Sequence, residues 1–147
     1  MAQAQQYCTF YLDGLFFGVE VMKVQEVLVY QKMTGVPLAP AVVRGLINLR
    51  GQIVTAIDMR RRLQLRERPD GEQPMNVVIK DDDGAISLLV DEIGDVLDVE
   101  QQSFEPPPEN LTGTTRALIR GAYKLEDRLL LVLDTEKTIT LTADQNA

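Results

Sequence analysis

Asp58 is the residue whose type and position point most directly to chemistry. It ends the apolar run 53–57, and the phosphoacceptor aspartate of a receiver domain occupies such a strand end. The structural alternative is that Asp58 caps a short helix over 59–65. The cap is favoured because Asp134 ends a matching run, and a duplicated phosphorylation site is not expected. Receivers also need long helices over a parallel sheet, whereas this chain is rich in hairpin signals.

Histidine is absent and cysteine occurs once, which removes the commonest catalytic and metal-binding chemistry. Ser-His-Asp triads, imidazole metal sites, thiolate zinc sites and internal disulfides are excluded. Cys8 has no histidine to activate it, so a buried, inert thiol is favoured over a nucleophile. The acidic run from Asp81 to Asp83 lacks the spaced oxygen ligands of a calcium loop, and a solvated hairpin turn is favoured. We therefore expect no cofactor and no bound metal.

A cluster of arginines follows Asp58. Its members are Arg60, Arg61, Arg62, Arg66 and Arg68. Such a cluster could contact an anion, but a solvated helix face is the default expectation on a net acidic protein.

The charge is unevenly distributed along the chain. Fifteen Lys and Arg against 22 Asp and Glu give a net charge of −7. Residues 1–73 hold 9 basic and 7 acidic residues (9 − 7 = +2), and residues 74–147 hold 6 and 15 (6 − 15 = −9). This balance argues against nucleic acid or anionic lipid as a partner. Without a leader or an apolar run of about 20 residues, we expect a cytoplasmic protein that is not inserted in a membrane.

Short β-branched and apolar runs joined by turn signals predict a mainly β, all-β fold. Asp13 followed by Gly14 is typical of a tight turn with positive φ. Four hairpins are expected, with strands over 7–12 and 15–21, 46–49 and 52–57, 76–80 and 85–90, and 118–124 and 128–133. Short helical segments are expected over 22–26, 59–65 and 135–142, and 66–74 is expected to be a polar linker.

An internal repeat organises these hairpins. Residues 43–58 align with 119–134 at an offset of 76, and 24–27 align with 93–96 at an offset of 69. Four residues are identical between the copies: Arg44/Arg120, Gly45/Gly121, Leu49/Leu125 and Asp58/Asp134. The chain is expected to form one domain over 5–142, with subdomains over about 7–66 and 74–134 and a closing helix over 135–142. Five short strands can close into a barrel, and the groove between two such units is a favoured binding site.

Glu26 and Arg50 differ between the two copies. The second copy has Asp95 and Glu126 at the aligned positions, so only the first copy can form an ion pair there. Two unrelated surface charges are the alternative. An arginine at the tip of the apolar hairpin 46–51 is suited to a partner carboxylate.

Several blocks of the sequence form a specific pattern. The blocks are Val24-Gln-Glu-Val27, Thr34-Gly-Val-Pro37, Ala39-Pro40, Val43-Arg-Gly-Leu-Ile-Asn-Leu-Arg-Gly-Gln-Ile-Val54, Asp58-Met-Arg60, Val90-Asp-Glu-Ile-Gly-Asp-Val96 and Leu133-Asp134. This pattern resembles the CheW family of chemotaxis coupling proteins over about residues 5–142. The resemblance implies two intertwined five-stranded β-barrels resembling SH3 domains. It also implies a non-catalytic adaptor that couples methyl-accepting chemoreceptors to the histidine kinase CheA.

The resemblance also implies which residues contact the partners. The cytoplasmic tip of the receptor is expected in a groove that includes Val24, Glu26, Gly45, Arg50, Ile93 and Val96. The regulatory domain of CheA, which has the same fold, is expected near Val77 and Val78. The adaptor is expected to be monomeric alone and to join rings in receptor arrays.

Three other functions stay open at this point. A CheW-like adaptor could serve pili or another output, and Asp58 could belong to a receiver-type regulator. A generic SH3-like peptide binder is less favoured, because such modules use aromatic grooves and this chain has four Tyr, four Phe and no Trp.

Overall fold

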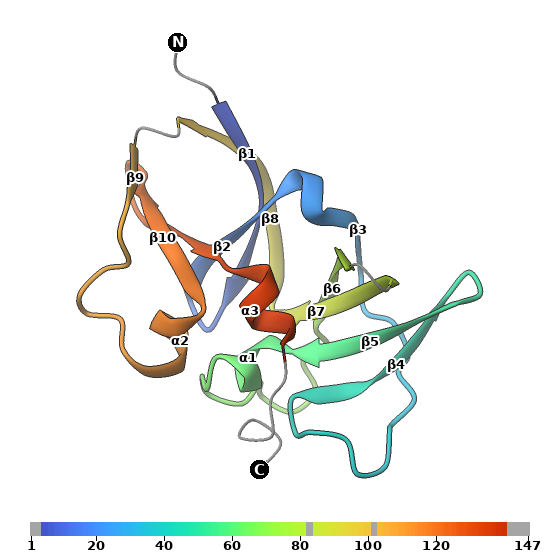
Figure 1. The fold of residues 1–147 in the computed structure, drawn as a ribbon. Helices are drawn as coiled ribbons and strands as arrows, with labels where there is room; N and C mark the ends of the chain where they lie inside the picture. Colours follow the sequence, from blue (N-terminus) through green and yellow to red (C-terminus); the bar gives the residue numbers. More distant parts are fainter. Residues whose placement is uncertain (1–3, 82–83, 101–102, 141–147) are drawn as a thin grey trace.

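Short antiparallel hairpins dominate the computed structural model, which describes residues 4–81, 84–100 and 103–140 (Figure 1). The strands are β1 (Ala4–Leu12), β2 (Leu15–Glu20), β3 (Val24–Leu28), β4 (Val43–Leu49), β5 (Gln52–Asp58), β6 (Met75–Asp81), β7 (Gly84–Val90), β8 (Glu92–Glu100), β9 (Phe104–Glu105), β10 (Ile119–Lys124) and β11 (Leu129–Leu133). The helical elements are η1 (Val21–Lys23), α1 (Met59–Arg62), α2 (Gly113–Ala117) and α3 (Thr135–Ile139). The predicted fold class, mainly β with short helices, is confirmed.

The strands form two sheets whose first five strands have equivalent order, but the edge strand β9 makes one sheet six-stranded and not five-stranded as expected. The sheet β3-β6-β7-β5-β4 is called the central barrel here, and the sheet β8-β1-β2-β11-β10-β9 is called the terminal barrel. In each, one parallel pair joins two hairpins: β5 lies beside β7, and β11 lies beside β2. The offset of 69 places β1, β2 and β3 on β6, β7 and β8, and the offset of 76 places β4 and β5 on β10 and β11. The sequence repeat is therefore a repeat of strand order.

The two sheets do not follow the expected division into residues 7–66 and 74–134. After β2 the chain leaves the terminal barrel, and β3 pairs with β6 in the central barrel. After β7 it returns, and β8 pairs with β1. Each barrel therefore contains strands from both halves of the sequence, as the intertwined fold implied by the family resemblance requires.

Three clusters of buried apolar side chains hold the sheets together. One lies in the central barrel around Ile47 and Val54, and one in the terminal barrel around Phe16 and Leu130. The largest, called the shared core here, takes side chains from both barrels. Its members include Phe10, Leu12, Phe17 and Val19 with Ile57, Met59, Val77, Ile79, Leu88 and Val90. Burying one such side chain is worth roughly 1.5–3 kcal/mol, so the shared core fixes each barrel to the other.

Two tight turns confirm predicted hairpins. Asp13 and Gly14 have φ of 49° and 83°, and Arg50 and Gly51 have φ of 52° and 90°. Positive φ at both central residues is the requirement of a two-residue type I′ turn.

The helices are shorter than expected. The segment 22–26 contributes only to η1 before β3 begins, and α1 ends at Arg62 because Gln64 takes a left-handed conformation, with φ of 60°. Both predicted caps are confirmed. Asp58 accepts hydrogen bonds from two N–H groups of α1, and Asp134 accepts one from the Lys137 N–H at 3.0 Å.

The expectation that the arginines form a solvated helix face is wrong for Arg60 and Arg62, which are buried. Arg62 Nε donates to the carbonyl of Thr138, and its Nη2 donates to the carbonyl of Lys137, both at 2.7 Å. Nη2 also donates to Thr140 at 3.3 Å, so a guanidinium of α1 caps the C-terminal end of α3. Burial lowers the pKa of Arg62. The charge run was misinterpreted because composition does not reveal which arginines face a neighbouring helix end.

Replacing Arg62 with Met should lower the free energy of unfolding by about 2–4 kcal/mol, because buried carbonyls lose a charged donor. Denaturant unfolding measures the difference. Arg44→Met is the matched control, because Arg44 is exposed and the described residues offer it no ion pair; its change should stay within about 0.5 kcal/mol. Equal losses for the two variants would contradict the capping role.

Candidate functional site

The equivalent strands β3 and β8 carry most of the residues expected to contact the receptor. Val24 on β3 and Ile93 on β8 are partly buried, and both pack against the shared core from their own strands. Val96 on β8 is 56% exposed, and Val27 on β3 is 43% exposed. These strands therefore flank the shared core with half-buried and exposed apolar side chains.

Glu26 and Arg50 form the ion pair that their position in the repeat allowed. Arg50 Nη2 donates to Glu26 Oε2, which joins β3 to the tip of the β4–β5 hairpin. The Arg50 side chain is 72% exposed, whereas that of Glu26 is 20% exposed. An ion pair this exposed contributes little to stability, so most of the Arg50 guanidinium stays available to a partner.

Gly45 is buried against the protein's own chain. A Cβ at Gly45 would lie 2.7 Å from the carbonyl oxygen of Thr34 and 3.1 Å from Cβ of Met33. The close approach allows Thr34 and Leu46 to exchange two backbone hydrogen bonds, of 2.9 and 2.8 Å. The space that was expected to admit a partner at Gly45 is therefore filled by the loop before β4.

In the second copy of the repeat, another segment approaches Gly121 just as closely. A Cβ there would lie 2.5 Å from the carbonyl oxygen of Glu105 in β9. β9 pairs with β10 through Glu105 and Ala122, and Ala122 is the repeat equivalent of Leu46. The recurring Arg-Gly pair thus marks the point where a second segment crosses the barrel.

Val77 and Val78, the residues expected near the kinase, are buried. Val77 is 1% exposed and belongs to the shared core, and Val78 is fully buried inside the central barrel. Neither side chain is accessible to a partner in this conformation. Both lie on β6, whose alternation places one inside each of two cores.

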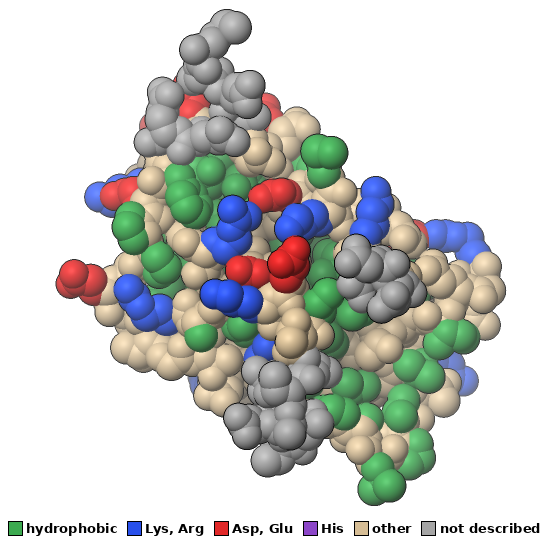
Figure 2. Space-filling model, viewed as in Figure 1, with side chains coloured by type: hydrophobic (Ala, Val, Ile, Leu, Met, Phe, Trp, Pro, Cys, Tyr) green, Lys and Arg blue, Asp and Glu red, His purple; other side chains and the backbone are tan. Residues whose placement is uncertain are grey.

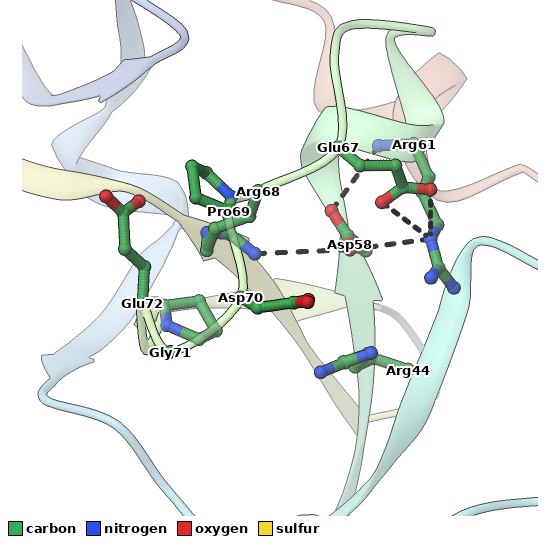
Figure 3. A pocket seen from close by; sticks show the side chains of 10 residues that line it. Arg44, Asp58, Arg61, Glu67, Arg68, Pro69, Asp70, Gly71 and Glu72 are labelled. Carbon is green, nitrogen blue, oxygen red and sulfur yellow. Dashed lines mark hydrogen bonds and ion pairs between the residues drawn. The ribbon is translucent and has the colours of Figure 1, made fainter.

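Asp58 lies in a polar pocket of about 430 Å³ beside the 67–74 segment (Figure 3). Its Oδ1 accepts hydrogen bonds from the backbone of Arg60 and Arg61, at 3.0 and 3.3 Å. Its Oδ2 lies 3.7 Å from Nε of Arg61 and 4.0 Å from Nη1 of Arg68. Asp58 is 3% exposed and is held as a cap between guanidinium groups, which favours the structural interpretation over a phosphoacceptor.

An ion-pair network extends from this pocket to the β1–β2 turn. Asp91 accepts hydrogen bonds from Arg60 Nε at 2.9 Å, Arg68 Nη2 at 3.0 Å and the Asp13 N–H at 2.8 Å. Burial alone would raise the pKa of Asp91, but these donors outweigh it and lower the pKa. The hydrogen bond from Arg66 lowers the pKa of Asp13. The segment 66–74, which was expected to be a polar linker, is therefore held against the β1–β2 turn and Asp91 by the ion pairs of Arg66 and Arg68.

Several large apolar side chains are exposed on the surface, and the sequence analysis did not identify them. They are Met22 (82% exposed), Val29 (67%), Leu38 (104%) and Ile53 (61%). Leu38 also has φ of 65°, which is unfavourable for a leucine. Ile53 aligns with Leu129 in the repeat, and both are exposed in the structure, but the sequence alone shows only that both are apolar.

Cys8 is disfavoured as a nucleophile by its surroundings. Burial raises the pKa of the Cys8 thiol, which disfavours the thiolate. Within residues 4–81, 84–100 and 103–140, no group of three or more Cys, Asp and Glu is placed to hold a metal ion. Asp82 and Asp83 lie outside the described residues. None of the described helices is long and apolar enough to cross a membrane.

The fold belongs to a mainly β class in which two sheets of equivalent strand order share one core. It is similar over 97% of both chains to the crystal structure of the scaffolding protein TtCheW from Thermoanaerobacter tengcongensis, with a TM-score of 0.86 and 24% identity. Residues 6–143 match the CheW-like domain, and the chain belongs to this family.

Two curated relatives agree with this assignment. The chemotaxis protein CheW of Treponema pallidum (strain Nichols) is 32% identical over 90% of this chain and 80% of its own length. The chemotaxis protein CheW of Bacillus subtilis (strain 168) is 30% identical over 97% of this chain and 92% of its own. The resemblance seen in the sequence is confirmed.

Gly45→Ala should lower the free energy of unfolding by about 1–3 kcal/mol, because the new Cβ forces the Thr34 backbone away. Chemical denaturation measures the loss. Gly35→Ala is the control in the same loop, since a Cβ at Gly35 meets nothing within 4 Å. If Gly45→Ala kept full stability but lost receptor binding, the glycine would serve the partner and not the loop.

Proposed function

We propose that this chain is a chemotaxis adaptor that couples methyl-accepting chemoreceptors to a CheA-type histidine kinase. Membership of the CheW-like family supports the role. The observation that carries it is the pair of equivalent strands β3 and β8, which present apolar side chains beside the shared core, together with the ion pair that Glu26 of β3 forms with Arg50. This combination suits the docking of a helical partner.

The receptor contact is proposed on β3 and β8. A helix docked in a groove needs an apolar floor and a few polar anchors. Val24, Ile93 and Val96 supply the floor, and the exposed Arg50 supplies an anchor for a carboxylate of the receptor tip. Gly45 acts indirectly, by holding the loop before β4 in place.

The kinase contact is proposed on the outer side of the central barrel. The buried Val77 and Val78 cannot reach a partner, so the contact near β6 must use exposed side chains of the same barrel. Ile53 and Leu38 are large, apolar and exposed, and such groups anchor protein interfaces. The strained backbone of Leu38 is tolerated where an exposed side chain serves binding.

Coupling of this kind needs no reaction on the adaptor. Two partners held on one rigid two-barrel body are fixed relative to each other, and the kinase is shifted toward one conformation by differential contact. The adaptor is proposed to act in the cytoplasm at receptor arrays, as a monomer that joins rings with the kinase. An adaptor for pili or another output would use the same surfaces, and no observation favours it.

Binding to each partner tests the proposal. The purified protein should bind a chemoreceptor cytoplasmic fragment and the regulatory domain of CheA, each with a Kd of about 10 µM or tighter. Titration calorimetry measures both. The double variant Ile53→Asp, Leu38→Asp should weaken kinase binding at least about tenfold and leave receptor binding unchanged. Absence of binding to both partners would refute the adaptor role.

Arg50→Glu should abolish receptor-dependent kinase activation in a reconstituted array and leave the melting temperature within a few degrees, because the pair is exposed. The charge-swapped variant Glu26→Arg, Arg50→Glu separates two roles. Failure of the swap to restore activation means that Arg50 contacts the receptor. Full restoration would mean that the ion pair acts only by holding the hairpin.

A further inference from the structure

A pocket of about 310 Å³ lies on the terminal barrel, where the β1–β2 hairpin, the segment between β9 and α2 and the start of β11 meet. The described lining residues all fall within 11–16, 108–111 and 128–131. The pocket therefore uses neither β3 and β8 nor the central barrel, which carry the surfaces proposed for the receptor and the kinase. Its volume is close to the lower limit of small-molecule sites, about 300 Å³.

Most of the pocket lining is apolar. Leu131 and Phe16 are 4% and 5% exposed, so the inner part of the pocket is formed by side chains that are otherwise buried. Leu15 and Leu111 are partly buried and pack against the shared core, and Leu129 is 37% exposed. An apolar lining with a few polar groups is the usual character of a site for a small ligand.

Arg128 supplies the cation of the described lining. Its guanidinium carbon lies 4.1 Å from the ring centroid of Phe16 and 5.6 Å from that of Tyr11, and its Nη1 donates to the Tyr11 hydroxyl. These contacts hold the guanidinium against the aromatic wall. Its ion pair with Asp127 is long, at 3.7 Å, and exposed, so the remaining N–H groups can bind a carboxylate from a ligand.

The wall that follows β9 is held in place by Arg116. Its Nη1 donates to the carbonyl of Pro108 at 2.5 Å and to those of Pro107 and Leu111 at 3.5 Å. The prolines also restrict φ along this segment, which stiffens it. A wall that is already ordered reduces the entropic cost of binding a ligand.

The internal repeat shows that the sheet does not require the aromatic and cationic groups of the pocket. Tyr11 faces Phe16 across β1 and β2, and Lys80 faces Ala85 in the same register of β6 and β7. The aligned positions are Tyr11/Lys80, Phe16/Ala85 and Arg128/Gln52. The central barrel therefore forms the same strands without the two rings and without the guanidinium. These three side chains distinguish the terminal barrel, and binding accounts for them.

The surroundings of the pocket favour a small ligand over a protein. Figure 2 shows apolar side chains gathered at the lower right, over β4 and the segment before it in the central barrel. Of the described residues that line the pocket, Leu129 alone is a large apolar side chain that is exposed. Asn110 and Arg128, both exposed, make the rim polar. A stable protein contact covers about 800 Å² of each partner, whereas the apolar groups here lie inside the hollow.

We infer that this pocket binds a small carboxylate that has an apolar body. Arg128 pairs with the carboxylate, and Leu15, Leu111 and Leu131 contact the body. The charge of the ligand follows from the described lining, which contains this one guanidinium and no carboxylate. The site goes beyond the adaptor role and does not depend on it.

Titration of the full chain with 2-naphthoate, followed by NMR, tests the inference. The methyl signals of Leu15, Leu111 and Leu129 should shift, with a Kd of about 1 mM or tighter. The matched alcohol 2-naphthalenemethanol, which lacks the charge, should bind at least about fivefold more weakly. Acetate, which lacks the apolar body, should not shift these signals.

Replacing Arg128 with Met should weaken naphthoate binding at least about fivefold and leave binding of the alcohol within about twofold. Arg120→Met is the matched control and should leave both affinities unchanged. Arg120 has a similarly exposed side chain in the same barrel, at 47% against 42% for Arg128, and lies outside the described lining.

Four outcomes would overturn the inference. Equal affinities for naphthoate and the alcohol exclude recognition of a carboxylate, and this comparison stands even if Arg128→Met fails to fold, because it uses the wild-type chain. The same effect of Arg128→Met and Arg120→Met on naphthoate binding excludes a specific role for Arg128. Shifts confined to Leu38 and Ile53 would show adsorption on exposed apolar surface. Protection of Leu129 by the regulatory domain of CheA, with no shift from naphthoate, would make the pocket a protein contact.

Discussion

The shared core between the barrels is the interaction on which the rest of the structure depends. Each barrel has its own small cluster of apolar side chains, but the largest cluster belongs to neither alone. Val24 and Ile93 pack against it, so the strands proposed for receptor binding rest directly on the contact that sets the barrel geometry. A change in how the barrels meet would move both strands together. For an adaptor, whose output is the relative position of two partners, a rigid shared core is the central requirement.

Duplication gave this protein two copies of one scaffold, and substitution then gave them different surfaces. The glycines at 45 and 121 and the caps at 58 and 134 are the same in both because each solves a backbone problem that recurs. The charges at Glu26 and Arg50 diverged, since these two side chains bond to other side chains and not to the backbone. Glu26 and Arg50 are paired, whereas their equivalents Asp95 and Glu126 are both acidic. The backbone thus specifies the fold, and the side chains that differ between copies are free to specify partners.

The sequence predicted local structure well and long-range pairing poorly. The turn at Asp13 and the caps at Asp58 and Asp134 followed from residue types, because each depends on a few neighbouring groups. The exchange of β3 and β8 between the barrels leaves no local signal in the sequence. The repeat therefore predicted two consecutive subdomains, over about 7–66 and 74–134. Val77 and Val78 show the same limit. A run of valines marks a buried strand, and only the sheet order reveals that both of its faces are covered.

The exchange of β3 and β8 also determines the order in which strands can pair while the chain is being synthesised. The central barrel uses strands between residues 24 and 90, so all its pairing partners leave the ribosome before β8 begins. The β1–β2 hairpin is made first, yet its neighbours β8 and β11 are made only after the whole central barrel. The β1 edge stays unpaired until residues up to about 100 have emerged, and the β2 edge stays unpaired until residues up to about 133 have emerged. The crossing that joins the two barrels therefore leaves the nascent chain with an open sheet edge for most of its translation.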